Sequence, residues 1–289
     1  MYFDEDLLLD IRLNSLDKYI KKFVITEATY THNGNKKKLN FNINNFKKFK
    51  DKIEYIIVDK QPNNIRKLVE GESEEKRGEK LILNGMARDY YQRECLKKGL
   101  SKTSEEDLIL ISDLDEIPNL ENLNVDKIKD NIIIFEQKMF YYKLNLFYED
   151  FIWQGTKATK SKNFKSPQWI RNIKGKKYPW WRIDTFFSNK KYSNLIFIKN
   201  GGWHFTCIRT PEELEKKFLN FAHHYEFEES GLKINDLKKL IEEKRVMYDH
   251  NIDQKGYKWS GKSILKKINE SGLPSYITNN LDKYKNWLD

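Results

Sequence analysis

The chain has 289 residues, a length that suits one large domain or two small ones with a substantial core. Its charged fraction is high at 33%, but 17 Phe, 16 Tyr and 7 Trp supply apolar area that a disordered chain lacks. No apolar stretch approaches the roughly 18 residues of a membrane span, and the acidic start MYFDEDLLLDIRL is unlike a secretory signal. We therefore expect one folded, cytoplasmic α/β domain without a transmembrane segment, which leaves peripheral membrane contact open.

The first part of the chain alternates between helical and strand patterns. Apolar residues recur at helical spacing near the start, and short runs rich in β-branched residues follow. We expect a helix over 5–20, strands over 21–30 and 53–59, a polar loop over 71–80, a helix over 81–100 and a strand over 107–113. Strand, crossover helix and strand predict a parallel sheet. Ligands of such sheets bind at the carboxyl ends of the strands.

The second part of the chain has a different sequence pattern, with more loop and more tryptophan. Residues 132–146 predict a long mixed strand or a hairpin, and 153–181 are basic, loop-rich and full of tryptophan, as in a lid or a binding surface. A helix is predicted to start at Pro211, with Thr210 as its N-cap and Glu213 at the third position. The tail from about 231 predicts amphipathic helix and polar loop.

The net charge and the cysteines narrow the classes of partner. The charge of +10 suggests a polyanionic partner, but the lysines are spread along the whole chain. A solvated lysine-rich surface explains this charge better, so we expect no nucleic-acid partner. Cys95 and Cys207 are too few for a disulfide framework and lack metal-ligand spacing, which fits a reducing compartment.

The stretch SDLDEIP places three carboxylates directly after an apolar run. On an extended chain, residues two apart point to the same side, so Asp113 and Asp115 can converge on one cation while Glu116 faces away. Oxygen ligands suit Mg²⁺ or Mn²⁺. The alternative is a solvated acidic turn, but the buried strand before the carboxylates favours a site.

The stretch GGWHF is a second candidate. Its glycines allow the backbone to approach a ligand closely, Trp203 offers a stacking face and His204 offers a ligand nitrogen. A lone histidine among aromatic residues is also typical of a hydrogen-bonded core position.

Arginines and tryptophans complete the set of candidates. Arg88 and Arg93, on the helix before the carboxylates, can pair with a diphosphate or with acidic neighbours on the same helix. Flat aromatic faces suit sugar rings or unstacked bases, although such residues also anchor irregular loops. The tryptophans in the basic segment are Trp153, Trp169, Trp180 and Trp181.

Taken together, these stretches resemble glycosyltransferase family 17, the family of the bisecting β-1,4-N-acetylglucosaminyltransferase. The matching stretches are FDEDLLLDIRLNSLDKYIKKFVITEATYTHNGNKKKLNF, YYQRECLKKGL, SDLDEIP, WQGTKATK with PQWIR, and NGGWHF. They cover residues 3 to about 225 in family order. Their combination is far more specific than a single DxD motif, which occurs by chance in many proteins.

The resemblance implies a GT-A fold, a Rossmann-like nucleotide-diphospho-sugar transferase fold with a central, mostly parallel sheet. It divides a single domain 1–289 into a nucleotide-sugar half (about 1–120), an acceptor or lid half (about 121–230) and a helical tail (231–289). Asp115 would ligate the metal, Asp113 would hold ribose or metal-bound water, and His204 would approach the metal or the diphosphate. Thr26 and Glu27 would lie near the nucleotide.

The implied reaction is an inverting transfer of N-acetylglucosamine from UDP-GlcNAc to a glycan hydroxyl, with Mn²⁺ or Mg²⁺ as cofactor. A carboxylate must accept the proton of the acceptor, and Glu116 and Asp184 are the candidates. Paired carboxylates on a basic surface also fit a metal-dependent nuclease or phosphotransferase, and the tryptophans fit a non-catalytic glycan-binding module.

Overall fold

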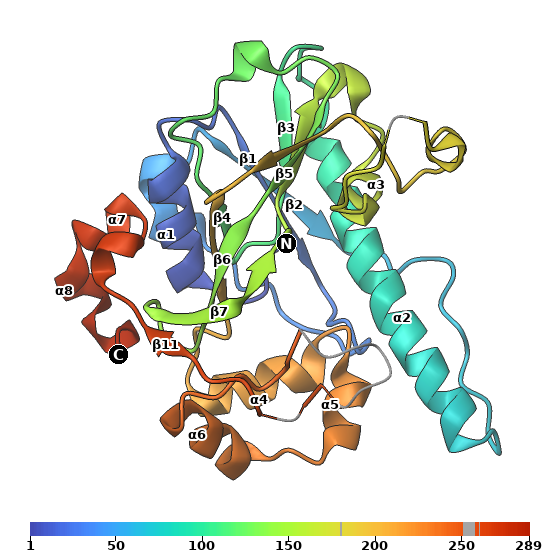
Figure 1. The fold of residues 1–289 in the computed structure, drawn as a ribbon. Coiled ribbons are helices and arrows are strands. Elements are labelled where there is room, and N and C mark those ends of the chain that lie inside the picture. Colours follow the sequence, from blue (N-terminus) through green and yellow to red (C-terminus); the bar gives the residue numbers. More distant parts are fainter. Residues whose placement is uncertain (180, 251–257, 260) are drawn as a thin grey trace.

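The computed structural model describes residues 1–179, 181–250, 258–259 and 261–289. Helices and strands are mixed along the chain, and the strands form sheets of two, five and four strands with helices packed around them (Figure 1). The helices are α1 (Asp6–Leu16), α2 (Glu74–Glu94), α3 (Pro167–Asn172), α4 (Pro211–Asn220), α5 (His224–Ser230), α6 (Ile234–Glu242), α7 (Ser275–Thr278) and α8 (Leu281–Tyr284). The strands are β1 (Phe23–Ala28), β2 (Ile53–Val58), β3 (Leu108–Ile111), β4 (Glu116–Pro118), β5 (Ile132–Phe135), β6 (Gln137–Tyr141), β7 (Leu146–Trp153), β8 (Lys157–Lys160), β9 (Leu195–Ile198), β10 (Gly202–Thr206) and β11 (Lys266–Lys267).

The strands form mixed sheets, which corrects the expectation of one mostly parallel central sheet. β1 and β2 pair in parallel, as predicted, but β3 pairs antiparallel with β8 in the order β3-β8-β5-β9. The other large sheet has the order β11-β7-β6-β10-β4. Only Glu136 separates β5 from β6, so the chain passes directly from one sheet to the other. β6 then pairs antiparallel with β7 after a short connection, because such connections cannot join parallel strands.

Most predicted elements are present, with one clear correction. The polar segment 71–80 is not a loop, because α2 begins at Glu74 and the side chain of Ser73 accepts a hydrogen bond from the backbone N–H of Lys76. At α4 the predicted capping box forms between Thr210 and Glu213. The segment 153–181 contains β8 and α3 in addition to its loops.

Two apolar clusters hold the layers together. The buried side chains of α1, including Leu9 and Leu13, pack with Ile117, Phe140 and Phe205 from the five-stranded sheet. A second cluster joins β6 and β7 to α4, α5 and α6, which lie together below the sheet in Figure 1. Within the described residues, no helix combines the length and the hydropathy that crossing a bilayer requires.

The second glycine of GGWHF is needed where β10 runs against β4. Gly202 pairs with Pro118 and has a φ of +128°, and a Cβ atom there would lie 2.1 Å from the carbonyl oxygen of Ile117. We expect Gly202→Ala to lower the free energy of unfolding by about 2 kcal/mol or more, because it adds a backbone clash to the strain of positive φ. Urea denaturation measures this loss.

The matched control is Gly231→Ala. Gly231 also has a positive φ, of +71°, but a Cβ atom added there would have no other atom within 4 Å. This variant should lose only the conformational strain, about 1 kcal/mol. Equal losses in the two variants would show that the close approach of β10 to β4 is unimportant.

Candidate functional site

Asp113 and Asp115 lie in the tight connection between β3 and β4, and Glu116 is the first residue of β4. Arg12 of α1 reaches under this connection and donates hydrogen bonds to the backbone carbonyls of Asp113, at 3.3 Å, and Glu116. Its other terminal nitrogen donates to the hydroxyl of Ser112. An arginine therefore fixes the course of the backbone from which the carboxylates project. Its sequence signal is a charged residue within the apolar run LLLDIRL.

Asp113 is held by arginines from two distant segments. Arg171 of α3 donates to its Oδ2 at 2.7 Å, and Arg93 of α2 donates to its Oδ1 at 3.3 Å. Burial alone would raise the pKa of Asp113, but the positive charges of Arg171 and Arg93 outweigh burial and hold it well below its usual value. Asp113 is therefore ionised and fixed in orientation.

Glu116 supports the site from behind. Its side chain is fully buried and accepts hydrogen bonds from Arg171 at 2.9 Å, from the indole of Trp153 at 2.7 Å and from the hydroxyl of Thr156 at 3.3 Å. The backbone N–H of Asp113 also donates to it. Glu116 therefore holds Arg171 and Trp153 in position, and because it is fully buried an acceptor sugar cannot reach it. This placement does not support its predicted role as general base.

Asp115 faces His204 in the wall of a cavity. The imidazole Nε2 lies 3.6 Å from Oδ1 of Asp115, too far for a hydrogen bond. The His204 Nδ1 atom is buried and has no hydrogen-bond partner in the described part of the chain. Trp153 stacks on the same ring at 4.5 Å between centroids. Burial raises the pKa of Asp115, but His204 and Lys217 together outweigh burial, so the pKa lies below its usual value.

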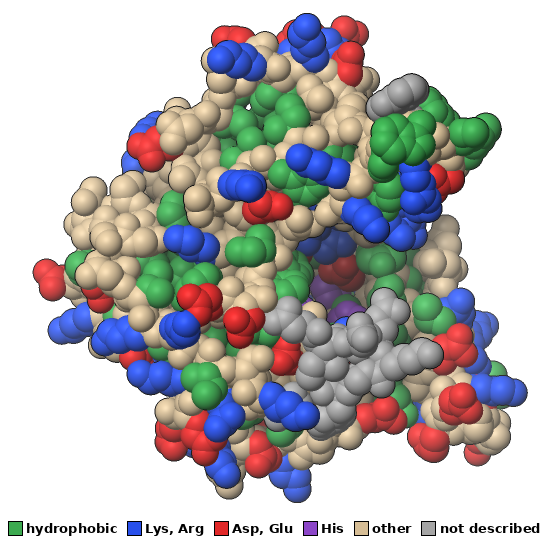
Figure 2. Space-filling view, in the orientation of Figure 1, with side chains coloured by type: hydrophobic (Ala, Val, Ile, Leu, Met, Phe, Trp, Pro, Cys, Tyr) green, Lys and Arg blue, Asp and Glu red, His purple; other side chains and the backbone are tan. Residues whose placement is uncertain are grey.

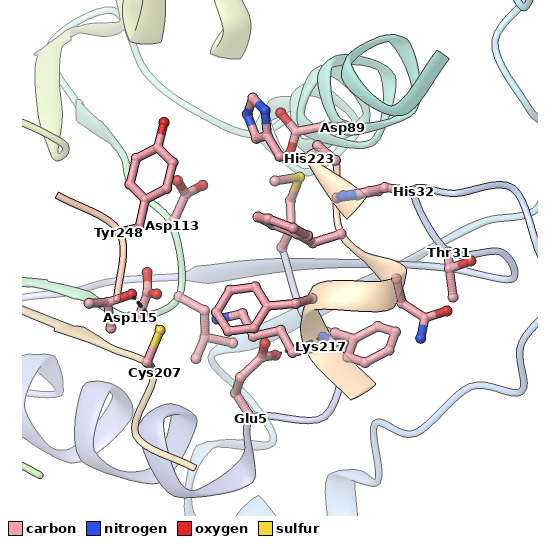
Figure 3. A pocket seen from close by; sticks show the side chains of 18 of the residues that line it. Glu5, Thr31, His32, Asp89, Asp113, Asp115, Cys207, Lys217, His223 and Tyr248 are labelled. Atoms are coloured by element: carbon pink, nitrogen blue, oxygen red, sulfur yellow. Dashed lines mark hydrogen bonds between the residues drawn. The ribbon is translucent and has the colours of Figure 1, made fainter. Parts of the chain in front are cut away.

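The cavity has a volume of about 470 Å³ and lies between the carboxylates, α2 and α4. Figure 3 shows Asp113 and Asp115 on one side of it, with Asp89, His223 and His32 on the opposite side. In the space-filling view a histidine and acidic side chains are visible at the bottom of the hollow (Figure 2). Polar residues that line it include Glu5, Thr31, His32, Lys37, Asp89, Gln92, Arg93, Asp113, Asp115, His204, Lys217, Asn220, His223 and His250.

Lys217 is a cavity residue that the sequence analysis missed. It projects from α4, and its positive charge lowers the pKa of Asp115. It forms no ion pair with any residue that the structure describes. Its only sequence signal is a place near the end of a capped helix, which many surface lysines share.

His223 and His250 also line the cavity without having been predicted. A hydrogen bond from His223 Nδ1 to Glu226, at 2.9 Å, raises the pKa of His223. Burial and the nearby His204 lower the pKa of His250 to about 4. One cavity histidine is thus favoured in its charged form and the other in its neutral form.

Several predicted binding residues lie outside the cavity lining. Thr26 and Glu27 are fully buried, and Glu27 binds Lys37, Tyr55 and two backbone N–H groups instead of facing a nucleotide. Arg88 donates to Gln61 and to the carbonyl oxygen of His32, so it supports the loop that borders the cavity. Of the two predicted arginines, only Arg93 reaches the lining.

The aromatic candidates separate in the same way. Trp153 lines the cavity, whereas the Trp203 indole donates to the carbonyl oxygen of Gly272 and packs in the core. Trp169 packs against Tyr192 in a separate cluster. Trp181 is exposed, and Trp180 lies outside the described residues.

Asp184 makes its contacts in a different part of the fold from the predicted carboxylates of SDLDEIP. It forms ion pairs with Arg182 and Lys191, both at 2.7 Å, in the segment that connects α3 to β9. It does not line the cavity. Its placement does not support a role as general base.

The described residues contain no group of three His, Cys, Asp or Glu side chains gathered around a metal-sized point. A cation at this cavity would therefore have few protein ligands. The two candidate ligands that face each other in the cavity wall are Asp115 and His204.

Comparison with known proteins identifies the family. The family model of glycosyltransferase family 17 matches residues 1–289, so the chain belongs to this family and is a glycosyltransferase. No curated protein and no solved structure matches it. Because the chain belongs to a glycosyltransferase family, the alternative functions of a nuclease, a phosphotransferase or a non-catalytic glycan-binding module are set aside.

Proposed function

We propose that this glycosyltransferase transfers N-acetylglucosamine from UDP-GlcNAc to a hydroxyl of a glycan acceptor, with inversion and with the help of a divalent cation. The observation that carries the proposal is the facing pair of Asp115 and His204 in the wall of a cavity, beside an ionised Asp113. The donor is inferred from the resemblance to the bisecting N-acetylglucosaminyltransferase. We also propose the GT-A type of nucleotide-sugar site, with the carboxylates at the end of β3.

The side chains present fit a divalent cation with few protein ligands. Asp115 offers an ionised carboxylate, and the Nε2 atom of His204 lies 3.6 Å away without a hydrogen bond between them. One or two protein ligands, completed by water and phosphate oxygens, are typical of cations in nucleotide sites. An imidazole ligand favours transition metals, so we expect Mn²⁺ to be preferred to Mg²⁺. When bound, the cation would stabilise the negative charge of the departing diphosphate.

The remaining groups of the cavity suit the rest of the donor. Lys217 forms no ion pair among the described residues, so its positive charge is available to an approaching diphosphate. Asp113, fixed by Arg171 and Arg93, can accept a hydrogen bond from a ribose hydroxyl or a metal-bound water. Trp153 lines the cavity with its ring stacked on His204, and the rest of its aromatic surface is of the kind that packs on sugar rings.

The acceptor hydroxyl must lose its proton to a base within the cavity. Glu116 is enclosed and Asp184 lies elsewhere, so the carboxylates left for this role are those in the lining. Besides Asp113 and Asp115 these are Glu5 and Asp89 among the described residues. Glu5 lies 3.0 Å from Arg209 and Asp89 lies 2.8 Å from Arg93, so an arginine holds each of them in a fixed position from which it can accept a proton.

A donor screen without acceptor tests the proposal. Purified protein is incubated with a panel of nucleotide sugars in Mn²⁺, Mg²⁺ or EDTA, and the slow release of nucleotide by hydrolysis is measured. We expect UDP release from UDP-GlcNAc, fastest with Mn²⁺ and absent in EDTA. Release from a different donor would overturn the proposed sugar, and undiminished release in EDTA would overturn the cation.

A further inference from the structure

The four most exposed large hydrophobic side chains of the described residues lie on one short stretch. Trp181, Ile183, Phe186 and Phe187 are 65%, 72%, 77% and 87% exposed, and no other described large hydrophobic residue exceeds 60%. They belong to the described residues 174–179 and 181–191, which we call the aromatic loop. Neighbouring hydrophobic side chains as exposed as these mark interaction surfaces.

The exposure does not come from an unstructured segment. The backbone N–H of Lys174 donates to the carbonyl oxygen of Lys190 at 2.7 Å and closes the base of the aromatic loop. At its tip, Thr185 and Phe186 donate to the carbonyls of Arg182 and Ile183, each at 3.1 Å. These backbone groups are thus satisfied within the loop, so the tip can enter an apolar environment without leaving them unpaired.

The aromatic loop also carries an excess of positive charge. Its basic residues are Lys174, Lys176, Lys177, Arg182, Lys190 and Lys191. Its one carboxylate, Asp184, is already paired with Arg182 and Lys191. Among the described residues, Lys174, Lys176 and Lys190 have no carboxylate partner. The loop therefore presents to solvent a hydrophobic tip next to positively charged side chains. Figure 2 shows hydrophobic side chains with basic ones beside them at the upper right.

We propose that the aromatic loop docks the protein on an anionic membrane surface. Aromatic side chains and isoleucine would enter the region between headgroups and acyl chains, and the lysines would meet lipid phosphates. A second copy of this chain is a poorer partner, because the two loops would bring like charges together. A protein partner is also disfavoured, because lysine is depleted at protein interfaces.

The position of the loop gives docking a consequence for the reaction. The hollow that contains the carboxylates opens on the same face as the aromatic loop (Figure 2). A docked molecule would therefore hold its cavity close to the membrane surface, which suits an acceptor glycan carried on a lipid. This extension rests on the proposed function, whereas the docking itself does not.

Vesicle co-sedimentation tests docking without any turnover. The full chain is mixed with phosphatidylcholine vesicles that contain or lack phosphatidylglycerol, and the variant is Phe186→Ser with Phe187→Ser. We expect wild type to bind the anionic vesicles, and the variant to bind at least about tenfold more weakly, because each phenylalanine buries apolar area. The matched control, Val69→Ser with Ile264→Ser, removes residues that are 59% and 60% exposed elsewhere and should bind as wild type.

The charges are tested in the same assay. Lys176→Gln with Lys190→Gln should weaken binding and reduce its dependence on salt. The proposal is overturned if wild type does not bind the anionic vesicles, or if the phenylalanine variant binds as tightly as wild type. Size-exclusion chromatography that shows a wild-type dimer, lost in the phenylalanine variant and without vesicle binding, would instead assign the loop to contact between two copies.

Discussion

Replacing Asp115 with asparagine is expected to reduce metal-dependent release of UDP by at least about 10²–10³-fold while the melting temperature changes little. The side chain is 18% exposed and faces the cavity, so asparagine keeps its shape and removes its charge. The lowered pKa of Asp115 keeps the wild-type carboxylate ionised, and this is the form that binds a cation. Nucleotide release with Mn²⁺ and calorimetric titration of UDP in Mn²⁺ measure the two consequences.

The control for Asp115→Asn is Asp126→Asn, which removes a carboxylate from an exposed position away from the cavity. It should behave as wild type in both assays. Unchanged turnover in Asp115→Asn, with the fold intact by circular dichroism, would remove Asp115 from the metal site. Loss of turnover together with loss of folding would instead give the carboxylate a structural role.

The position of the candidate site in the chain was predicted from local sequence patterns. An apolar run followed by clustered carboxylates predicted a strand with ligands at its end, and β3 ends at Ile111, directly before them. Helix signals at Thr210 and Glu213 were equally local, and the capping box they predicted is present. Such features depend on residues close together in the chain, and for this reason sequence alone can identify them.

The roles of individual residues depended on contacts between distant segments. Glu27 and Glu116 both follow the pattern of functional carboxylates, yet both are fully buried anchors whose partners come from elsewhere in the fold. Neighbours on a strand point to opposite faces, so Trp203 and His204 could not both face one ligand. In the structure His204 faces the cavity and Trp203 faces the core.

The largest stability effect is expected at Arg171, which joins α3 to the carboxylates of the site. It binds Asp113 at 2.7 Å and the fully buried Glu116 at 2.9 Å. Burial lowers the pKa of Arg171, but these two carboxylates raise it by more. We expect Arg171→Met to lower the free energy of unfolding by about 3–5 kcal/mol, because it leaves a buried carboxylate without its cation. Urea denaturation at neutral pH measures the loss.

The stability difference between wild type and Arg171→Met should change in a defined direction as the pH falls. The pKa of Asp113 is lowered in the folded protein, so its ion pair with Arg171 contributes stability above the usual pKa of 3.8 and loses it as the pH falls below that value. The difference in stability between wild type and Arg171→Met should therefore shrink in acid. A difference that grows as the pH falls would contradict this assignment.

A second substitution separates the buried charge from the packing of the arginine. Adding Glu116→Gln to Arg171→Met removes the uncompensated carboxylate, while the glutamine oxygen can still accept the hydrogen bond of the Trp153 indole, so part of the lost stability should return. Arg182→Met is the control, because its ion pair with Asp184 is exposed (side chains 46% and 40%) and should contribute at most about 1 kcal/mol. If the double variant is no more stable than Arg171→Met, packing of the arginine and not its charge holds α3 against the site. If the double variant recovers stability, the guanidinium of Arg171 stabilises the fold by neutralising Glu116. The same guanidinium keeps Asp113 ionised at the edge of the cavity.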